Sequence, residues 1–368
     1  MLFRHGCSSL WTAYLKPANC YRLFSSRGQS NEHYANIDWD NLGFDHVSTD
    51  YMYTAKCYQT GEFSQGSIDP LGGIQIFPSA GVINYGQGVF EGLKAYRKEN
   101  ERDILLFRPY ENALRMKKGA ERMCMPSPSI EQFIKAVKQV AMANRRWIPP
   151  PEKGALYIRP LLLGTGSLLG LAPAPEYTFL AYVCPVGNYF KEGSTGLNLY
   201  VEDNIHRSTL GGAGDVKTIS NYAPVLKAQI NAKNRGFSDV LFLDSANKSF
   251  IEEASASNIF IANGNVISTP SLKRGTILPG ITRKTIIQLS RSLDYKVEER
   301  DISVEELSKA EQVFCTGTAV VVAPVRTVTY KDQRFEYRNS TVSNELHRIL
   351  IGIQTGVLQD TMDWTVPI

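Results

Sequence analysis

The sequence predicts an α/β protein of the α+β type, arranged as two domains. The chain has 368 residues, which is enough for two domains that each bury a core. Stretches with the pattern of strands alternate with stretches of helical periodicity, but without the strict strand–helix–strand repeat of a doubly wound sheet. A polar, glycine-containing stretch near the middle, FKEGSTG at 190–196, separates the two halves. We therefore expect a smaller domain at 36–190, a linker at 191–200 and a larger domain at 201–368.

The first 31 residues differ from the rest of the chain in their charge. They contain four basic residues and no acidic residue, and the first carboxylate is that of Glu32. An arginine- and serine-containing segment without acids is typical of an organellar transit peptide, although a disordered basic tail has the same composition. We expect residues 1–31 to direct the protein to the mitochondrion, with the plastid as the alternative.

Charge, hydropathy and cysteine spacing exclude several classes of protein. Removing the four basic residues of the head leaves 36 basic against 36 acidic residues, so the body lacks the net basic charge typical of a nucleic-acid-binding domain. The best apolar candidate, Pro160–Pro175, is short and interrupted by glycines, which argues against a membrane span. The six cysteines form no C-x-x-C pair and the five histidines no H-E-x-x-H motif, so we expect neither a disulfide framework nor a metal site.

The clearest element of the first domain is a helix from Ser129 to Arg146, because its apolar residues recur at helical spacing. Ser129, with Gln132 three residues later, makes a capping box at the start of this helix. The prolines at 149–151 end it. Further along, the apolar run FLAYVCPV at 179–186 predicts a buried strand.

The second domain contains the same mixture of elements. The run DVLFLD at 239–244 predicts a strand. Residues 258–268 predict a hairpin, because Asn263-Gly264 suits a tight turn between two alternating segments. Residues 278–293 begin with a proline–glycine turn and continue as an amphipathic helix. Residues 312–325 predict a strand that is interrupted by small residues at 316–319.

The stretch LGGAGDVKTISNY at 210–222 almost spells the nucleotide-binding P-loop. Gly211 is in place, but the position before the lysine is Val216 rather than glycine, and a β-branched residue resists the positive φ angles of such a loop. A second interpretation treats Lys217 as the amine that bonds to a carbonyl cofactor such as pyridoxal phosphate. We favour this second interpretation over nucleotide binding.

A pyridoxal-phosphate site also needs a carboxylate, a hydroxyl donor and a phosphate-binding turn. The carboxylate is either Glu252 or Glu253, because neighbours in an extended segment point to opposite sides. Tyr222 is the candidate hydroxyl, and the helix start at 278–282 has free N–H groups that bind anions. The turn at 316–318 is a second candidate for the phosphate. On pattern alone, each of these is equally an ordinary loop.

Several blocks of the sequence together resemble a known family. They include NYGQGVFEGLKAYR (84–97), GGAGDVKTISNYAPVL (211–226), EEASASNIF (252–260), GTILPGITRKTI (275–286) and FCTGTAVVVAPV (314–325). In these blocks the chain resembles the branched-chain amino acid aminotransferases, pyridoxal-phosphate enzymes of fold type IV, and it looks closest to their plant members. The resemblance implies a two-domain fold with the cofactor at the domain interface.

The resemblance assigns the cofactor site residue by residue. Lys217 matches the catalytic lysine, which bonds covalently to the cofactor and moves a proton to and from the substrate Cα. Tyr222 matches the tyrosine at the phenolic oxygen of the cofactor. Glu253, rather than Glu252, matches the carboxylate at the pyridine nitrogen. The other matched positions are Arg115, Ile281, Thr282 and Thr318 for the phosphate, and Arg207, whose role stays open.

The resemblance also assigns a substrate pocket. An apolar, aromatic wall is matched by Tyr85, Phe90, Tyr157, Leu171 and Ala319. Arg159 matches an arginine that receives the distal carboxylate of glutamate, so one pocket accepts both an aliphatic and an acidic side chain. Family members contribute Tyr85 and Leu171 from the neighbouring subunit, which implies a homodimer with shared active sites.

The implied activity is the reversible transfer of an amino group between L-leucine, L-isoleucine or L-valine and 2-oxoglutarate, which gives branched 2-oxo acids and L-glutamate. Lys217 is the expected general acid and base. Two other fold type IV enzymes remain as alternatives, a D-amino acid aminotransferase and an aminodeoxychorismate lyase. A P-loop nucleotide-binding protein is the third alternative.

Overall fold

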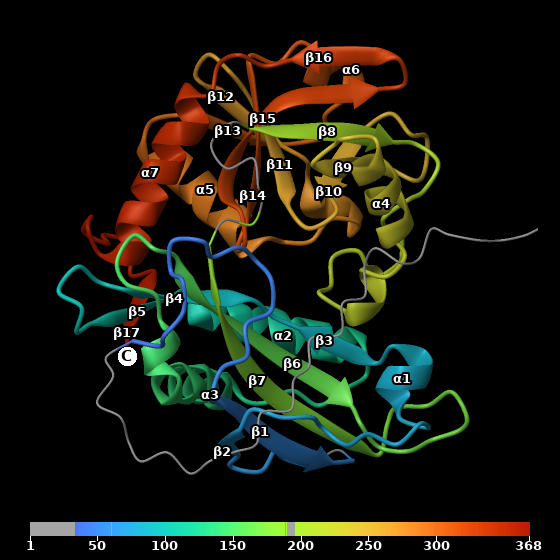
Figure 1. The fold of residues 1–368 in the computed structure, drawn as a ribbon. Coiled ribbons are helices and arrows are strands. Elements are labelled where there is room, and N and C mark those ends of the chain that lie inside the picture. The colour runs from blue at the N-terminus through green and yellow to red at the C-terminus, as the bar shows by residue number, and fades with distance from the viewer. Residues whose placement is uncertain (1–33, 60, 188, 190–195) are drawn as a thin grey trace, which may run out of the picture. The chain divides into compact units, whose positions relative to one another are not determined.

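Two β-sheets with their helices account for the part of the chain that the structure describes (Figure 1). The structure is a computed structural model that describes residues 34–59, 61–187, 189 and 196–368. The expected transit segment at 1–31 and residues 191–195 of the expected linker lie outside the described residues. Within the described residues, no helix is long and apolar enough to cross a membrane.

The first sheet is antiparallel and has the strand order β17-β5-β4-β6-β7-β1-β2, with β3 paired to β6. The long pair β6 and β7 forms its centre, and both strands are buried over most of their length. The strands are β1 Tyr51–Tyr58, β2 Ser67–Pro70, β3 Gly88–Phe90, β4 Leu93–Arg97, β5 Ile104–Phe107, β6 Ala155–Gly164, β7 Glu176–Val186 and β17 Thr365–Pro367.

The helices of this half are α1 Gly81–Tyr85, α2 Pro109–Arg122 and α3 Ile130–Ala143. α2 and α3 pack on the sheet, and Phe133 of α3 stacks on Phe179 of β7 with ring centroids 6.0 Å apart. The serine half of the predicted capping box is confirmed, since the Ser129 side chain accepts a hydrogen bond from the Gln132 N–H at 3.1 Å, whereas the Gln132 side chain donates to the Ser64 carbonyl. The helix ends at Ala143, three residues earlier than predicted, because the buried Asn144 turns its side chain to the backbone of β1.

The second sheet has the strand order β10-β9-β8-β15-β14-β11-β12-β13, with β16 paired to β15. It is mixed, since β8 runs parallel to both β9 and β15, and β12 runs parallel to β13. The strands are β8 Leu197–Glu202, β9 Asp239–Leu243, β10 Ile251–Ala254, β11 Asn258–Asn263, β12 Val266–Thr269, β13 Lys296–Glu299, β14 Gln312–Gly317, β15 Val321–Tyr330 and β16 Gln333–Glu336. The helices are α4 Leu226–Asn234, α5 Ile281–Ser292, α6 Val304–Ser308 and α7 Thr341–Thr355.

The two predicted turns of this half are confirmed. Asn263 pairs with Val266 across the β11–β12 hairpin, and Gly264 has a φ of 51°. The interruption predicted at 316–319 is the turn between β14 and β15, which pair in an antiparallel way on either side of it. This turn and the start of α5 both face the first sheet, because Thr318 and Pro279 hydrogen-bond residues of the first half.

Two details differ from the expected division at 36–190, 191–200 and 201–368. Residues 197–200 of the expected linker already belong to β8, whose alternate residues are buried in the core of the second sheet. The chain also returns to the first sheet at its end, where β17 pairs with β5. The two halves are therefore joined at two places, and Tyr34–Ile368 forms one compact unit.

Candidate active site

The stretch that carries Lys217 is fixed against the first sheet. The Phe90 N–H donates to the Lys217 carbonyl at 3.0 Å, and the Thr218 hydroxyl donates to the Gly88 carbonyl at 2.9 Å. Val216 is buried in the core of the first half, which explains why an apolar residue replaces the glycine of a P-loop here. The loop therefore anchors its lysine to β3 rather than curling around a phosphate.

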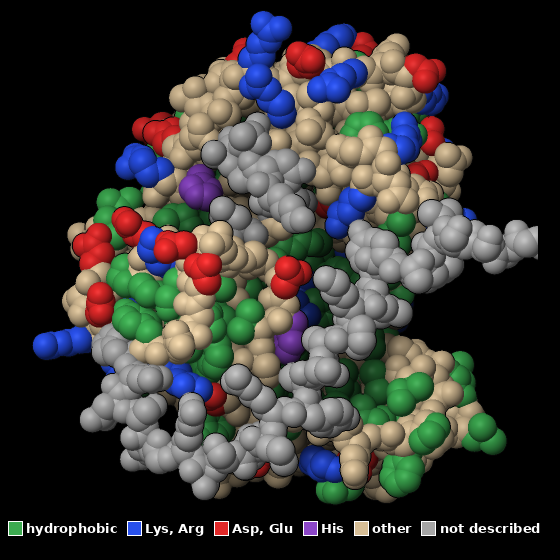
Figure 2. Space-filling view, viewed as in Figure 1, with side chains coloured by type: hydrophobic (Ala, Val, Ile, Leu, Met, Phe, Trp, Pro, Cys, Tyr) green, Lys and Arg blue, Asp and Glu red, His purple; other side chains and the backbone are tan. Residues whose placement is uncertain are grey.

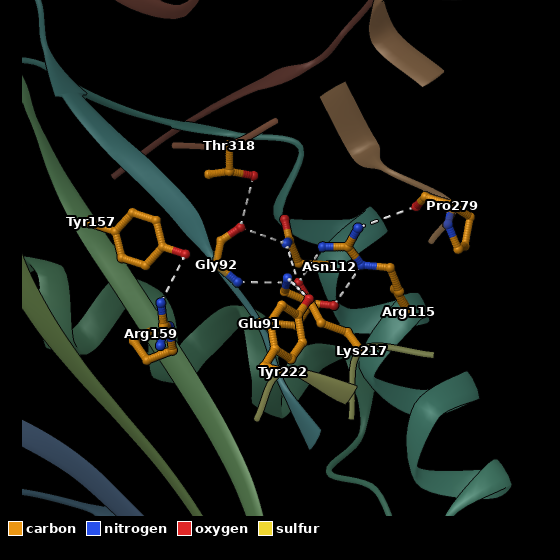
Figure 3. A network of polar contacts seen from close by, with 10 residues as sticks. All are labelled: Glu91, Gly92, Asn112, Arg115, Tyr157, Arg159, Lys217, Tyr222, Pro279 and Thr318. Atoms are coloured by element: carbon orange, nitrogen blue, oxygen red, sulfur yellow. Dashed lines mark hydrogen bonds and ion pairs between the residues drawn. The ribbon is translucent and has the colours of Figure 1, made fainter. Parts of the chain in front are cut away.

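The amine of Lys217 lies beside two aromatic rings, and Figure 3 shows it next to one of them, that of Tyr222. Its Nζ is 3.1 Å from the Tyr222 hydroxyl and 4.4 Å from the centre of the Phe90 ring. The Phe90 and Tyr222 rings contact each other edge to face, with centroids 4.8 Å apart. Tyr222 follows a short 3-10 turn at Ile219–Asn221, so it reaches the amine from a tight turn and not from a long helix.

Arg159 and Tyr157 extend this aromatic site along β6. They are two residues apart on the strand, so their side chains share one face of the sheet. The Arg159 guanidinium lies 4.9 Å from the Phe90 ring and 5.1 Å from the Tyr157 ring, and it donates to the Tyr157 hydroxyl at 3.3 Å. Gly92 is required here, because a Cβ at this position would collide with the Tyr157 hydroxyl.

Two further aromatic residues belong to the same wall, and sequence reasoning missed them. The Phe44 ring contacts the Tyr157 ring edge to face at 5.3 Å and the Tyr189 ring at 4.9 Å. Burial raises the pKa of Tyr189 to about 12, which keeps its hydroxyl protonated. Neither residue lies in a block that resembled the family, and each reaches the site from an irregular segment.

Arg115 projects from α2 into a buried ion pair (Figure 3). Its Nε and Nη2 atoms donate to the two carboxylate oxygens of Glu91 at 2.8 and 2.7 Å. Asn112 donates to the same carboxylate at 2.7 Å. Burial opposes the charge of this guanidinium, but Glu91 outweighs the effect and raises the pKa of Arg115. Glu91 lies in one of the blocks that resemble the family, but the sequence did not show that it pairs with Arg115.

The remaining Nη1 atom of Arg115 donates to the carbonyl of Pro279 at 3.2 Å, just before α5 begins. At the α5 N-cap, Gly280 offers no side chain, so no side-chain oxygen caps the first N–H groups. Ile281, Thr282 and Thr318 line a small cavity of about 20 Å³ beside this helix start. An uncapped helix start beside an arginine and two threonines suits an anion. These residues therefore fit the phosphate of the expected cofactor.

Glu253 forms a second buried ion pair. Its carboxylate lies 2.9 Å from the Arg207 guanidinium, and it also accepts hydrogen bonds from the Leu278 N–H at 2.7 Å and from Asn258 at 3.1 Å. Burial raises the pKa of Glu253 to about 7, while Arg207 and, more weakly, Lys217 act in the opposite direction. The open role of Arg207 thus has a structural answer, since it is the counter-ion of Glu253.

The model of the amino-transferase class IV family matches residues 88–328, which is more than half of the chain. The chain belongs to this family. It is 62% identical over 335 residues, 90% of this chain and 80% of the relative, to branched-chain-amino-acid aminotransferase 5, chloroplastic, of Arabidopsis thaliana. It is 58% identical over 342 residues, 92% of this chain and 86% of the relative, to branched-chain amino acid aminotransferase 1, mitochondrial, of Humulus lupulus.

A solved structure shares the architecture of this class IV aminotransferase. The branched-chain amino acid aminotransferase of Escherichia coli superimposes with a TM-score of 0.75. It is 26% identical, and the match covers 86% of this chain and 98% of the solved one. The predicted family and the predicted fold type IV are therefore confirmed.

Sequence reasoning also missed Lys94 of the aminotransferase. This lysine lies on β4, is buried, and donates through Nζ to the carbonyl of Ala319 at 3.1 Å. Burial lowers its pKa to about 8, and no carboxylate is among the causes of that shift. It lines the same small cavity as Thr282 and Thr318. A lysine inside the apolar run of a buried strand was the available signal.

Two residues assigned to the substrate pocket are not brought to Lys217 within this chain. Tyr85 lies on α1 and donates its hydroxyl to the carbonyl of Leu169. Leu171 lies in the connection between β6 and β7 and is 85% exposed. Phe90 contacts both Lys217 and Arg159, and Arg159 contacts Tyr157, whereas Tyr85 and Leu171 are exposed.

Proposed function

We infer that this class IV aminotransferase exchanges amino groups between L-leucine, L-isoleucine or L-valine and 2-oxoglutarate, with pyridoxal phosphate as cofactor. The activity predicted from the sequence is confirmed by relatives of 58–62% identity that are named branched-chain aminotransferases. The predicted cofactor is confirmed by the class IV aminotransferase family and by a solved branched-chain aminotransferase that holds pyridoxamine phosphate. The observation that carries the site assignment is the position of the Lys217 amine, 3.1 Å from the Tyr222 hydroxyl.

The residues that would hold the cofactor come from both halves of the chain. Arg115, the Ile281 and Thr282 N–H groups and the Thr318 hydroxyl would bind the phosphate, while Tyr222 would bind the phenolic oxygen. Glu253 would accept a hydrogen bond from the ring nitrogen and favour its protonated form. When bound, the cofactor supplies an electron sink for the pair left at Cα.

Lys217 is the group that moves the proton at the substrate Cα. Within the described chain its amine hydrogen-bonds the Tyr222 hydroxyl and lies over the Phe90 ring. The rings exclude water on those sides, which limits loss of the proton to solvent. The same lysine would take a proton from Cα in one half-reaction and return it in the other.

One substrate pocket would serve both amino acid partners. The aromatic wall of Phe90, Tyr157, Phe44 and Tyr189 suits a branched aliphatic side chain. The charged guanidinium of Arg159 contacts the Phe90 and Tyr157 rings and the Tyr157 hydroxyl. It is therefore available to bind the distal carboxylate of glutamate. Ala319 lies on the β14–β15 turn, where Lys94 binds its carbonyl.

A substrate panel tests this activity. The enzyme is assayed in both directions with L-leucine, L-isoleucine, L-valine, D-alanine and L-methionine, each against 2-oxoglutarate. We expect turnover of the three branched L-amino acids and none of D-alanine. Turnover of D-alanine with inert L-leucine would favour the D-amino acid aminotransferase. Release of pyruvate from aminodeoxychorismate would favour the lyase, and ATP binding without a cofactor absorption band would favour the P-loop protein.

Lys94→Met is expected to stabilise the cofactor-free protein while reducing activity. A buried charge without a counter-ion costs free energy, and its replacement by an apolar side chain is often stabilising by about 1–4 kcal/mol. Because the pKa of Lys94 is lowered to about 8, the unfolded chain binds more protons than the folded one between pH 8 and the ordinary lysine pKa. The gain in the free energy of unfolding is therefore full below pH 8 and shrinks above it.

Urea unfolding of both proteins at several pH values measures this gain, and kcat/KM measures the loss of activity. Lys56→Met is the control, because Lys56 also lies on a strand of the first sheet, but its side chain is exposed and pairs with Glu176. A Lys94→Met protein that is less stable than wild type at pH 7 would show that the charge is compensated.

We propose that the enzyme is a homodimer in which Tyr85 and Leu171 of each chain complete the site of the other. Hydrophobic side chains gather over α1 and its surroundings at the lower right of Figure 2. Exposed apolar patches of this kind mark interaction surfaces. The exposed apolar residues of this region are Ile74, Phe77, Ile83, Tyr85, Leu169 and Leu171.

The double variant Leu169→Asp, Leu171→Asp is expected to be monomeric and nearly inactive. These side chains are 92% and 85% exposed, so two aspartates there should leave the fold of the single chain intact. Analytical ultracentrifugation measures the mass, and the substrate panel measures activity. Ile230→Asp on α4, also an exposed apolar position, should leave the dimer intact. An active monomer would contradict the shared site.

We further propose that residues 1–31 direct the enzyme to an organelle, with the mitochondrion as the first expectation and the plastid as the second. The named plant relatives include a chloroplastic and a mitochondrial enzyme, which supports an organelle without choosing between the two. A fluorescent protein fused to residues 1–31 and imaged in plant cells tests this. Diffuse cytosolic fluorescence would contradict an organellar address.

A further inference from the structure

The C-terminal segment joins the two sheets next to the proposed phosphate site. α7 packs against α5 and the second sheet, and the chain then crosses to the first sheet as β17. β17 pairs with β5, and the Ile368 N–H donates to the Ile104 carbonyl at 3.0 Å beyond the last pair. Figure 1 shows β17 beside β5 below the end of α7. β5 leads directly into α2, the helix that carries Arg115.

Trp364, the residue before β17, packs on the junction between β5 and α2. It is 5% exposed, and its ring meets the Phe107 ring edge to face at 6.0 Å. Its carbonyl accepts the Arg108 N–H at 2.7 Å, and its ring lies 5.2 Å from the Arg108 guanidinium. Arg108 has a φ of 48°, a backbone conformation that a non-glycine residue adopts only when its surroundings hold it.

The Arg108 side chain crosses from the first half to the first two turns of α5. Its Nη1 donates to the Thr285 hydroxyl at 3.0 Å and to the Gln288 side chain at 2.7 Å. The Thr285 hydroxyl in turn donates to the Ile281 carbonyl at 2.8 Å. Two hydrogen bonds therefore connect Arg108 with Ile281, the first residue of α5.

A second link between the two helices runs beside the first. Glu111 of α2 accepts from Arg108 at 3.1 Å and from Lys284 of α5 at 2.7 Å. From Glu111, α2 continues for four residues, about 6 Å, to Arg115. Arg115 reaches the segment before α5 directly through the Pro279 carbonyl, and the contacts of Arg108 tie the first turn of α2 to α5 at a second place.

We propose that Arg108 and Trp364 are positioning residues for the cofactor phosphate. They hold the N–H groups of Ile281 and Thr282 on α5 at a fixed place relative to Arg115 on α2, and the C-terminal segment fixes Arg108 itself. The proposal rests on the assignment of Arg115 and the α5 start to the phosphate made above. A phosphate bridged between two elements binds best when the elements are already in place, because no ordering is then required on binding.

The test compares pyridoxal phosphate with pyridoxal, which lacks the phosphate. Dissociation constants of both are measured from the absorption of the bound cofactor, using full-length protein from which the cofactor has been removed. Arg108→Met and Trp364→Ala are expected to weaken binding of pyridoxal phosphate about tenfold, the lower end of the roughly 10–100-fold lost when groups that orient metal ligands are removed. Binding of pyridoxal should be unchanged within about twofold.

Two further variants calibrate the experiment. Arg115→Met should remove the preference for pyridoxal phosphate directly, and if it does not, the phosphate assignment fails rather than the positioning role. Arg146→Met removes a comparable contact far from α5, since Arg146 lies 5.3 Å from the Trp147 ring and pairs with Asp50 at 2.7 Å. It should lower stability without changing the ratio of the two dissociation constants.

The test depends on the ratio of the dissociation constants for pyridoxal and pyridoxal phosphate. If Arg115→Met changes it while Arg108→Met and Trp364→Ala leave it unchanged, or if both ligands weaken equally, the positioning role is wrong. Should either variant fail to fold by circular dichroism, Arg108→Lys decides instead. It keeps the charge but loses the fork whose Nη1 reaches Thr285 and Gln288 on α5 while its Nη2 reaches Glu111 on α2, so it is expected to shift the ratio in the same direction.

Discussion

Lys217→Ala is expected to lower kcat for L-leucine with 2-oxoglutarate by at least roughly 10²–10⁴-fold, the contribution of a positioned general acid or base. Among the described residues, the substitution removes the only amine in contact with both Phe90 and Tyr222, so no other group there stands in this place. Because the phosphate, Tyr222 and Glu253 contacts remain, the cofactor should still bind. Steady-state kinetics and the absorption spectrum of the purified variant measure both effects.

Lys118→Ala is the matched control for this experiment. The Lys118 amine pairs with Asp215 at 2.9 Å. Asp215 is two residues before Lys217, but this ion pair lies on the exposed side of the loop. Its loss should change activity by less than about twofold, because exposed ion pairs contribute little. A Lys217→Ala enzyme that turns over leucine at near wild-type rate would remove Lys217 from the mechanism.

Local features of the fold were predictable because their causes are local. The Ser129 cap, the Asn263-Gly264 turn and the interruption between β14 and β15 each depend on residues within a few positions of one another. Val216 is also a local feature, but one that excluded a structure. Its β-branched side chain argued against a P-loop, and the structure shows it packed in the core. With the P-loop set aside, the neighbouring Lys217 was interpreted as the amine that bonds to a carbonyl cofactor.

The pairings that complete the site were not predictable from composition or spacing. Glu91 and Arg115 are 24 residues apart, Arg207 and Glu253 lie on different elements, and Lys94 meets Ala319 from the other half of the chain. Only the folded chain brings such charges together. The roles proposed for Tyr85 and Leu171 are further still from what spacing can predict, since a single chain leaves both side chains exposed.

Glu253→Gln is expected to lower kcat by roughly 10²–10³-fold, the usual effect of removing one electrostatic contact to a reacting centre. A glutamine in this place still accepts a hydrogen bond from Leu278 but no longer favours a protonated ring nitrogen. Glu252→Gln is the matched control, because Glu252 is equally buried and adjacent but points to the Thr276 side of β10. It should retain most of the activity. Equal loss in both variants would contradict the assignment of Glu253.

The stability of the same variants separates the role of Glu253 in the fold from its role in the reaction. Glu253→Gln leaves the buried Arg207 without its counter-ion, which typically costs about 3–5 kcal/mol of the free energy of unfolding. Adding Arg207→Met removes the stranded charge, so the double variant should recover most of that stability. Its activity should stay as low as that of Glu253→Gln, because no carboxylate returns to the site. If activity recovered together with stability, Glu253 would act only by neutralising the charge of Arg207, and the ring nitrogen would need another partner.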